Sequence, residues 1–355
     1  MRLHLGFDSL IPGNGGICRV ARLIARVAAE EVAAGRLERA TACVLRDTAP
    51  PSNMGIPVQA CGGSRLQFVA RCSRAKFTAT HAIYDFVGLA AAHTILPFPR
   101  RPFLAYIHGI EVWKGWARPK YAQSADRAAV LVSNSVYTRE RASQWHPALA
   151  RAIVCWLGTE EDEAPVLSRG GRGPPRVLIL GRLNEDRYKG HDELLACWQA
   201  VREAVPDAIL TIAGTGPALL RFEKMAGALP AGSVEVRGFV PEADMPRLWA
   251  ETTVFAMPSR GEGFGLVYIE AMRQGLPVIA SVHDAASEVV ADGQTGYVVN
   301  LDRPGELPDR IIALLIDPER ARAMGLAGQR RWAEHFRYSA FRDRFRPLLQ
   351  EFLSR

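Results

Sequence analysis

The sequence predicts an α/β protein made of two doubly wound domains, each a parallel sheet with helices on both faces. The chain has 355 residues, which exceeds one ordinary hydrophobic core and predicts two domains of about 150–200 residues. Short apolar runs alternate with amphipathic helical patterns along most of its length, which is typical of right-handed βαβ units. One stretch rich in Gly and Pro interrupts this alternation and indicates the boundary between the domains.

The first predicted domain spans residues 1–157. A helix is expected from Cys18 to Ala33, because apolar residues recur there at helical spacing. The glycine turn at residues 13–16 opens this helix, and its backbone N–H groups could approach a phosphate or an acceptor, although a plain tight turn is the alternative. The predicted strands are Leu3–Phe7, Ala42–Leu45, Thr78–Tyr84, Phe103–Ile107 and Ala129–Asn134.

Residues 158–175 form the predicted linker, which is first acidic and then rich in Gly and Pro. The second domain is expected at 176–338, followed by a last helix within 339–355. The predicted strands of the second domain are Arg176–Leu180, Ile209–Ala213, Val234–Val236, Val254–Met257, Val278–Ser281 and Tyr297–Val299.

Composition favours a cytoplasmic enzyme. No apolar stretch approaches the ~20 residues of a membrane span, and the first residues lack the apolar core of a secretory signal. The six cysteines show no C-x2-C spacing and no histidine pattern, so they are expected to be reduced and buried.

Positive charge is concentrated in the first domain. The net charge is +7, and residues 41–110 hold seven basic and two acidic residues. Partners of such a surface are nucleic acid, an anionic membrane or a phosphorylated acceptor, and a solvated face without a partner is the alternative. No nucleic-acid-binding motif accompanies the charge, so we expect no nucleic acid. The basic residues are Arg46, Arg65, Arg71, Arg74, Lys76, Arg100 and Arg101.

Two carboxylates near a glycine-rich turn are the most informative pattern in the chain. Glu262 and Glu270 stand eight positions apart around Gly263, Phe264 and Gly265. A glycine-rich helix start at the carboxyl edge of a parallel sheet offers N–H groups to an anion, so we expect a phosphate near Gly265 and Leu266. In a helix the two carboxylates are ~12 Å apart, whereas retaining glycosidases need ~5–5.5 Å. They therefore suit hydroxyl groups around a phosphate, as in a nucleotide sugar.

This segment resembles a known family. Residues 262–275, with 277–279 and 288–290, are similar to the Glu-x7-Glu signature of family 4 glycosyltransferases, which are retaining enzymes of the GT-B fold. The resemblance extends to Gly181-Arg182-Leu183 with Lys189-Gly190, to the run 212–217, and to Gly238-Phe239-Val240. It implies two Rossmann-like domains that face a central cleft, with the C-terminal helix crossing back to the N-terminal domain.

The resemblance also implies roles for individual residues. Arg182 and Lys189 would hold the leaving diphosphate, and the forked donors of Arg suit phosphoryl oxygens. Glu262 would bind hydroxyls of the transferred sugar, and Glu270 would bind the ribose. His108, at the end of a predicted strand, would lie near the anomeric carbon and the sugar 6-hydroxyl. The implied donor-binding residues are Gly15, Gly16, Gly238, Phe239, Val240, Gly263, Phe264, Gly265, Leu266 and Glu270.

One loop departs from the family pattern. The family usually carries Gly-Gly-x-x-Glu before Glu288, whereas this chain has Asp284-Ala285-Ala286-Ser287. Alanine disfavours the backbone torsions that are open to glycine. The loop is therefore expected to differ locally, which leaves the identity of the sugar and acceptor open.

The sequence thus predicts a retaining transferase that moves a glucose- or mannose-type hexose to a lipid-linked or polysaccharide-precursor hydroxyl. The donor would be a GDP- or UDP-linked sugar. No Asp-x-Asp motif and no metal-type spacing occurs, so we expect no metal and no cofactor beyond the donor. An epimerase or hydrolase of the same fold is one alternative, and a catalytically silent sugar-nucleotide-binding protein is another. Peripheral binding at the inner face of the plasma membrane is a further expectation.

Overall fold

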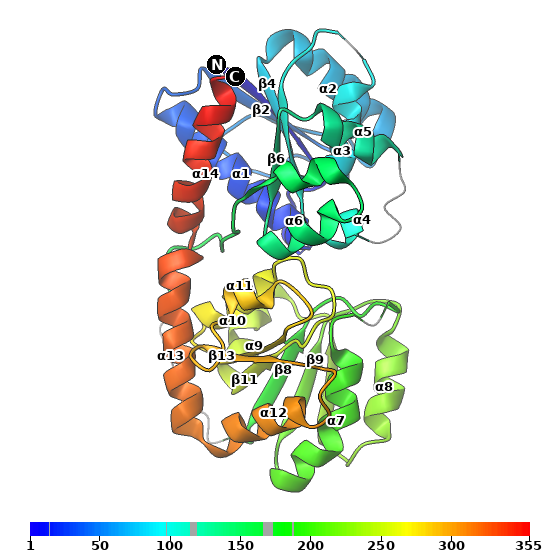
Figure 1. Ribbon diagram of the computed structural model, residues 1–355, viewed down its shortest axis with the longest axis vertical. Coiled ribbons are helices and arrows are strands. Elements are labelled where there is room, and N and C mark those ends of the chain that lie inside the picture. Colours follow the sequence, from blue (N-terminus) through cyan, green and yellow to red (C-terminus); the bar gives the residue numbers. More distant parts are fainter. Residues whose placement is uncertain (14, 97, 114–118, 166–172, 187) are drawn as a thin grey trace. The chain divides into compact units, whose positions relative to one another are not determined.

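The computed structural model describes residues 1–13, 15–96, 98–113, 119–165, 173–186 and 188–355. It divides into two compact units, Met1–Glu160 with Arg337–Arg355, and Glu161–Phe336. Each unit holds one parallel sheet with helices on both faces (Figure 1), so the predicted fold class is confirmed. Of the predicted linker, residues 166–172 lie outside the described residues.

The first unit is built on a seven-stranded sheet with the order β3-β2-β1-β4-β5-β6-β7. The order reverses beside β1, so the loops that follow β1 and β4 flank a topological switch point. The strands are β1 (Arg2–Phe7), β2 (Arg39–Val44), β3 (Val58–Ala60), β4 (His81–Tyr84), β5 (Phe103–Ile107), β6 (Val130–Ser133) and β7 (Ile153–Val154). The edge strands β3 and β7 were not predicted, because they are only three and two residues long.

Helices in the first unit follow the strands in the expected alternation. Helix α1 begins at the glycine turn, two residues earlier than the predicted Cys18. The helices are α1 (Gly16–Ala33), α2 (Arg65–Thr78), α3 (Val87–Thr94), α4 (Ile110–Trp113), α5 (Pro119–Arg127), α6 (Val136–Ser143), the short 3₁₀ turn Pro147–Arg151, and α14 (Tyr338–Leu353).

Helix α14 returns to the first unit, as predicted. Its buried aromatic residues recur at helical spacing and face the sheet. The ring of Phe345 lies 6.0 Å from Tyr106 of β5, and the ring of Phe352 lies 5.1 Å from His81 of β4. The Tyr338 hydroxyl donates a hydrogen bond to Glu30 of α1 over 2.7 Å. The last 16-residue helix is therefore part of the N-terminal core.

The second unit is a six-stranded parallel sheet with the order β10-β9-β8-β11-β12-β13. Here the order reverses between β8 and β11, which places a switch point between the loops that follow these two strands. The strands are β8 (Arg176–Leu180), β9 (Ile209–Ala213), β10 (Val234–Gly238), β11 (Val254–Ala256), β12 (Val278–Ser281) and β13 (Gly296–Val299). The helices are α7 (His191–Ala204), α8 (Leu219–Gly227), the 3₁₀ turn Glu242–Asp244, α9 (Met245–Glu251), α10 (Leu266–Arg273), α11 (Ala286–Val289), α12 (Glu306–Ile316) and α13 (Pro318–His335).

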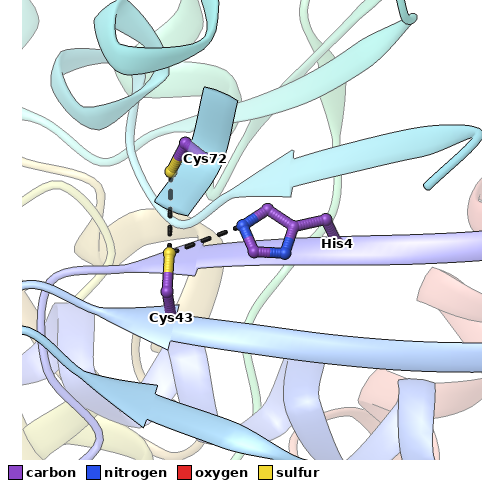
Figure 2. A group of neighbouring side chains, drawn as sticks. All are labelled: His4, Cys43 and Cys72. Atoms are coloured by element: carbon purple, nitrogen blue, oxygen red, sulfur yellow. Dashed lines mark hydrogen bonds between the residues drawn. The ribbon is translucent and has the colours of Figure 1, made fainter. Parts of the chain in front are cut away.

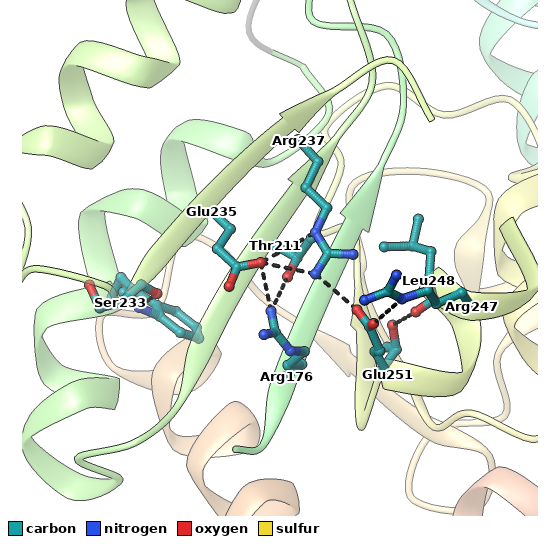
Figure 3. Close-up of polar contacts among 10 residues, drawn as sticks. Arg176, Thr211, Ser233, Glu235, Arg237, Arg247, Leu248 and Glu251 are labelled. Atoms are coloured by element: carbon teal, nitrogen blue, oxygen red, sulfur yellow. Dashed lines mark hydrogen bonds and ion pairs between the residues drawn. The ribbon is translucent and has the colours of Figure 1, made fainter. Parts of the chain in front are cut away.

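An ion-pair network ties strands β8 and β10 of this sheet to α9 (Figure 3). Glu235 of β10 accepts from Arg176 of β8 at 2.8 Å and from Arg237 at 3.0 Å. Arg237 also contacts Glu251 of α9 at 2.9 Å, and Arg247 extends the network outward. The network joins the edge strand β10 to the inner strand β8 and to α9.

Candidate active site

Three loops at the carboxyl edge of the second sheet are joined by backbone hydrogen bonds. Gly181 N donates to Ala213 O over 3.0 Å, and Gly214 N donates to Gly238 O over 2.7 Å. A Cβ at Gly214 would lie 1.8 Å from the Gly181 carbonyl oxygen, and its φ is +138°. Only glycine fits there. The predicted glycine run therefore sets the spacing between the loop that carries Arg182 and the turn at Gly238.

Lys189 and Glu262 face each other across the switch point. Lys189 follows β8, Glu262 follows β11, and the Lys189 Nζ donates to Glu262 Oε2 over 2.9 Å. The side chains are 17% and 23% exposed, so the pair is only partly screened by solvent. Burial alone lowers the pKa of Lys189, but the Glu262 carboxylate and the Tyr188 phenol outweigh burial and raise that pKa above its usual value. Lys189 is therefore a fixed cation at neutral pH.

Arg182 occupies the same loop but has a different environment. Its side chain is exposed, and among the residues that the structure describes it forms no ion pair. Lys189, by contrast, has the Gly181 backbone against its stem, where a Cβ would approach within 3.2 Å. The edge thus carries one cation that is held in place and a second, forked cation that is open to a ligand.

The Glu262 loop leads directly into the N-terminus of α10. Gly265 takes a left-handed conformation (φ 86°, ψ 64°), and no side chain caps the helix there. A Cβ at Gly265 would lie 2.1 Å from the Tyr268 ring. Phe264 is buried against Phe336, with ring centroids 6.0 Å apart, so its backbone rather than its side chain is available to a ligand. This geometry suits an anion at the helix start.

A buried layer that the sequence analysis did not identify supports this loop. The Tyr268 hydroxyl lies 2.8 Å from Met257 O and 3.0 Å from Asp284 Oδ2. Burial raises the pKa of Asp284 well above its usual range, and the charge of Glu262 adds to this effect. Ala285 N donates to Glu262 O over 3.1 Å. Asp284 and its partner Tyr268 are 16 positions apart in the chain, so no local sequence pattern identifies this pair.

The loop that departs from the family pattern has ordinary backbone geometry. Ala285 has φ −74° and ψ 3°, and the only non-glycine residue with positive φ in the described chain is Asn53. The glycine-like torsions are therefore not used here. The Asp284 Oδ1 accepts a hydrogen bond from Ala286 N over 2.7 Å at the start of the short helix α11.

The other residues of the second unit that were predicted to bind the nucleotide-sugar donor lie on neighbouring elements. Glu270 is half-buried in the second half of α10. Gly238 ends β10 with φ +62°. Phe239 follows with 70% of its surface exposed, and Val240 is half-buried. An exposed aromatic ring beside a glycine turn is consistent with a planar ligand at that point.

His108 lies in the first unit, directly after β5, and it is buried. Its Nε2 is 2.5 Å from the backbone oxygen of Asp85, so this nitrogen carries the proton and donates it. Its backbone N donates to Glu111 over 2.5 Å, and its backbone O accepts from Asn134 over 2.8 Å. Burial lowers the pKa of His108, although Glu111 and the Asp85 carbonyl oppose this shift. The ring is also stacked on Tyr106 at 5.8 Å.

Gly15 and Gly16 lie in the first unit at the start of α1. Gly15 has φ +101°, and a Cβ there would meet nothing within 4 Å. Asn14, in the same turn, lies outside the described residues. The predicted site residues therefore form two groups, with His108, Gly15 and Gly16 in the first unit and all the others in the second.

No helix that the structure describes is both long enough and apolar enough to cross a bilayer. The predicted basic surface is smaller than the sequence indicated. Lys76 is 4% exposed, and its Nζ donates to the carbonyl oxygens of His93 and Leu96. Arg101 is half-buried and donates to Lys76 O over 3.0 Å. The side chains of Lys76 and Arg101 therefore donate hydrogen bonds to backbone carbonyl groups and contribute little to a basic surface.

Comparison with known proteins identifies the family. The model described as "Glycosyl transferases group 1" matches residues 174–317, which include the whole carboxyl edge described above. A GDP-mannose-dependent alpha-(1-6)-phosphatidylinositol monomannoside mannosyltransferase of Mycolicibacterium smegmatis is 37% identical over 275 residues, covering 69% of this chain and 70% of that protein. The protein of the same name from Mycobacterium tuberculosis (strain CDC 1551 / Oshkosh) is 36% identical over 252 residues, covering 64% of each chain.

Solved structures share the fold. HepE of Anabaena, in complex with UDP and glucose, has a TM-score of 0.78 at 20% identity, covering 98% of this chain and 99% of that one. Sucrose-phosphate synthase of Thermosynechococcus elongatus has a TM-score of 0.80 at 19% identity, covering 99% of both. With the fold, the family match and the mycobacterial relative in agreement, the predicted resemblance is confirmed, and this chain belongs to the group 1 glycosyl transferases.

Proposed function

We propose that this glycosyltransferase moves mannose from a GDP-linked donor to a hydroxyl of an inositol-lipid acceptor, with retention of the anomeric configuration and without a metal. The relatives' names supply the donor and the acceptor class. The observation that carries the proposal is the Lys189–Glu262 pair beside Arg182 at the switch point. Such a position binds ligands in open α/β sheets, and these residue types suit a diphosphate next to a polyol.

The charges of the second unit suit the leaving group. Arg182 and Lys189 neutralise the diphosphate, and the start of α10 contributes roughly half a positive charge. Glu262 accepts hydrogen bonds from hydroxyls of the transferred sugar, and Glu270 does the same for the ribose. In the free enzyme Glu262 holds Lys189 in place. When the donor binds, the Lys189 ammonium shares its hydrogen bonds between the Glu262 carboxylate and the phosphate.

Front-face displacement fits this constellation. The bond between the anomeric carbon and the β-phosphate oxygen breaks, and the acceptor oxygen forms its bond on the same face. The acceptor proton passes to the departing phosphate oxygen. No carboxylate has to attack the sugar, which agrees with the separation expected between Glu262 and Glu270. His108, neutral and held by the Asp85 carbonyl, orients the sugar rather than acting as the base.

The function is tested by measuring mannosyl transfer with a panel of donors. Purified enzyme is given GDP-mannose, UDP-glucose or UDP-galactose with a phosphatidylinositol mannoside, and the anomeric configuration of the product is read by NMR. We expect transfer from GDP-mannose and an α-linked product. Glu262→Gln should remove activity, while Glu223→Gln, an exposed carboxylate on α8, should not. An inverted product, or donor consumption that does not need an acceptor, would refute the proposal in favour of a different mechanism or of a hydrolase or epimerase.

We also propose that one face of the first unit binds the cytoplasmic side of an anionic membrane. Helix α2 exposes Leu66 (85%) and Phe77 (68%), and the segment after α3 exposes Phe98 (68%). Exposed arginines accompany them at positions 65, 74 and 100. Apolar groups that insert and cations that meet headgroups are the features of interfacial binding. This chemistry would bring the enzyme to a lipid acceptor.

Vesicle sedimentation tests the membrane proposal. Binding should require anionic lipid and should be lost near 0.5 M salt, because each nearby cation is worth ~1 kcal/mol at such a surface. Leu66→Glu should weaken binding, whereas Leu220→Glu, on an equally exposed leucine of α8 (77%), should leave it unchanged. Equal binding of the two variants, or equal binding to neutral vesicles, would contradict the proposal.

A further inference from the structure

A compact group of metal-type ligands lies in the core of the first unit (Figure 2). His4 of β1, Cys43 of β2 and Cys72 of α2 converge there, and each offers a ligand atom within 4.8 Å of the others. The three residues are 5%, 1% and 0% exposed. None of them belongs to the proposed active site. The group joins the neighbouring strands β1 and β2 to the helix that carries Leu66 and Phe77.

Two of the three separations between the ligand atoms match the edges of a tetrahedral centre, and the third is at most 4.8 Å. Cys43 Sγ lies 3.6 Å from Cys72 Sγ and 3.4 Å from His4 Nε2. A tetrahedral Zn²⁺ with Zn–S of about 2.3 Å and Zn–N of about 2.0–2.1 Å places two sulfurs about 3.8 Å apart and sulfur and nitrogen about 3.6 Å apart. The observed separations fall within about 0.2 Å of these edges. Cys43 is therefore already spaced from both partners as three of the four ligands of one tetrahedral ion would be.

His4 is also oriented in the way a metal ligand requires. Its Nε2 faces the sulfurs, and its other ring nitrogen, Nδ1, lies 3.3 Å from Thr41 Oγ1. Metal-bound histidines usually donate this second N–H to a neighbouring acceptor, which fixes the ring and its tautomer. Thr41 occupies that position here.

The charges are compatible with burial. Two thiolates, one neutral imidazole and a divalent cation together carry no net charge, so the complete centre avoids the penalty of a buried unpaired charge.

We propose that His4, Cys43 and Cys72 bind one thiophilic divalent cation, Zn²⁺ by preference, as a structural centre that fastens α2 to the sheet. Thiolate and imidazole ligands select zinc over the hard cations Mg²⁺ and Ca²⁺. Binding releases the thiol protons to solvent, so the affinity rises with pH. None of these three residues takes part in the proposed sugar transfer, which is assigned to Arg182, Lys189, Glu262 and the residues around them.

Metal content and a cobalt spectrum test this inference on the full chain. Protein purified without chelator is analysed for zinc by mass spectrometry, and apoprotein refolded with Co²⁺ is examined for the thiolate-to-cobalt charge-transfer band. We expect about one equivalent of zinc, a cobalt band that zinc abolishes, and a higher melting temperature with metal than without it. Cys72→Ala should weaken metal binding more than ~100-fold, because losing a ligand costs more affinity than losing a residue that only orients a ligand. Cys155→Ala, another buried cysteine of this unit, should bind like wild type.

Other outcomes overturn the inference. The thiols would be a simple hydrogen-bonded pair if neither zinc nor cobalt binds while six free thiols are titrated in denaturant. A disulfide between Cys43 and Cys72 that survives metal addition would also exclude the centre. Because alanine in the core can impair folding, Thr41→Val provides a second variant. It keeps all three ligands and should weaken cobalt binding by about 10–100-fold, whereas equal affinity to wild type would contradict the proposed geometry.

Discussion

The two units hold their polar site residues in opposite electrostatic states. In the second unit, Lys189 is kept charged by Glu262, and Arg182 is an exposed cation. In the first unit, His108 is buried, and burial lowers its pKa, so it is neutral at pH 7. On the proposed function, the second unit would provide permanent positive charge for a diphosphate, and His108 would provide an oriented, uncharged hydrogen-bonding group. Substitutions in the two units should therefore fail in different ways.

The largest effect is expected from removing a cation of the second unit. Arg182→Ala and Lys189→Ala should each lower turnover by ~10²-fold or more, equivalent to about 2.7 kcal/mol of leaving-group stabilisation. The melting temperature of Arg182→Ala should hardly change, because the side chain is exposed and forms no ion pair among the described residues. Steady-state kinetics and a thermal melt measure both quantities.

Arg247→Ala is the matched control for these variants. Arg247 is also an exposed arginine of the second unit, 82% accessible, but it pairs with Glu251 in the α9 network. Its loss should leave turnover near wild type, since exposed ion pairs contribute little. Activity within threefold of wild type for both Arg182→Ala and Lys189→Ala would remove the diphosphate role.

A smaller and different effect is expected at His108. His108→Ala should lower kcat by roughly 10–10³-fold through lost orientation, while the nucleotide Kd stays within a few-fold, because the proposed base and ribose contacts lie in the other unit. The hydrogen bond to the Asp85 carbonyl is lost as well, so some fall in melting temperature is expected.

Asn134→Ala separates positioning from plain stability at this site. Its side chain supports the His108 backbone over 2.8 Å, so this substitution should also lower the melting temperature. If both variants lower stability and neither changes kcat, His108 only holds the end of β5. A selective loss of kcat in His108→Ala supports its role in positioning the sugar.

Sequence alone identified the second unit far better than the first. Arg182, Lys189 and Glu262 sit in loops whose strands are unmistakable, and parallel strands necessarily bring these loops to one edge. Strands β8, β9 and β12 have the predicted bounds. The zinc ligands proposed above are 39 and 29 positions apart from one partner to the next, so no local spacing reveals them. Lys76 was likewise predicted to be part of a basic surface, whereas the structure buries its side chain to 4% exposure.

The neutral histidines of the first unit predict a pH effect on stability. His93 is buried beside Lys76, His4 and the Tyr84 hydroxyl, and burial lowers its pKa to about 4 from 6.5. The unfolded chain therefore binds the proton first. The contribution of neutral His93 to the free energy of unfolding is complete above pH 6.5. It falls by about 1.4 kcal/mol per pH unit below that value and is fully lost near pH 4.

Urea unfolding at pH 7 and pH 5.5 measures this effect, with amide exchange in β4 and β5 reporting on the first unit. His93→Gln, which keeps a donor for the Arg101 carbonyl, should be less stable at pH 7 but should lose less on acidification. A variant whose pH dependence equals that of wild type would show that His93 does not stay neutral in the folded state.

The smallest expected effect tests the two units together. Transfer activity should change by less than threefold when EDTA is added to the assay, and Mn²⁺ should not raise it tenfold, because Arg182, Lys189 and the start of α10 supply the charge that a divalent ion would otherwise provide. The metal proposed for the first unit does not disturb this test, since its three ligands are at most 5% exposed and a brief treatment should not extract it.

Zinc analysis of the same sample before and after EDTA verifies that the buried metal stays in place. If activity falls more than tenfold and Mn²⁺ or Mg²⁺ restores it while the zinc content is unchanged, catalysis in the second unit needs a metal. If activity and zinc are lost together and only zinc restores both, the buried centre supports the active fold, and the charge assignment to Arg182 and Lys189 stands.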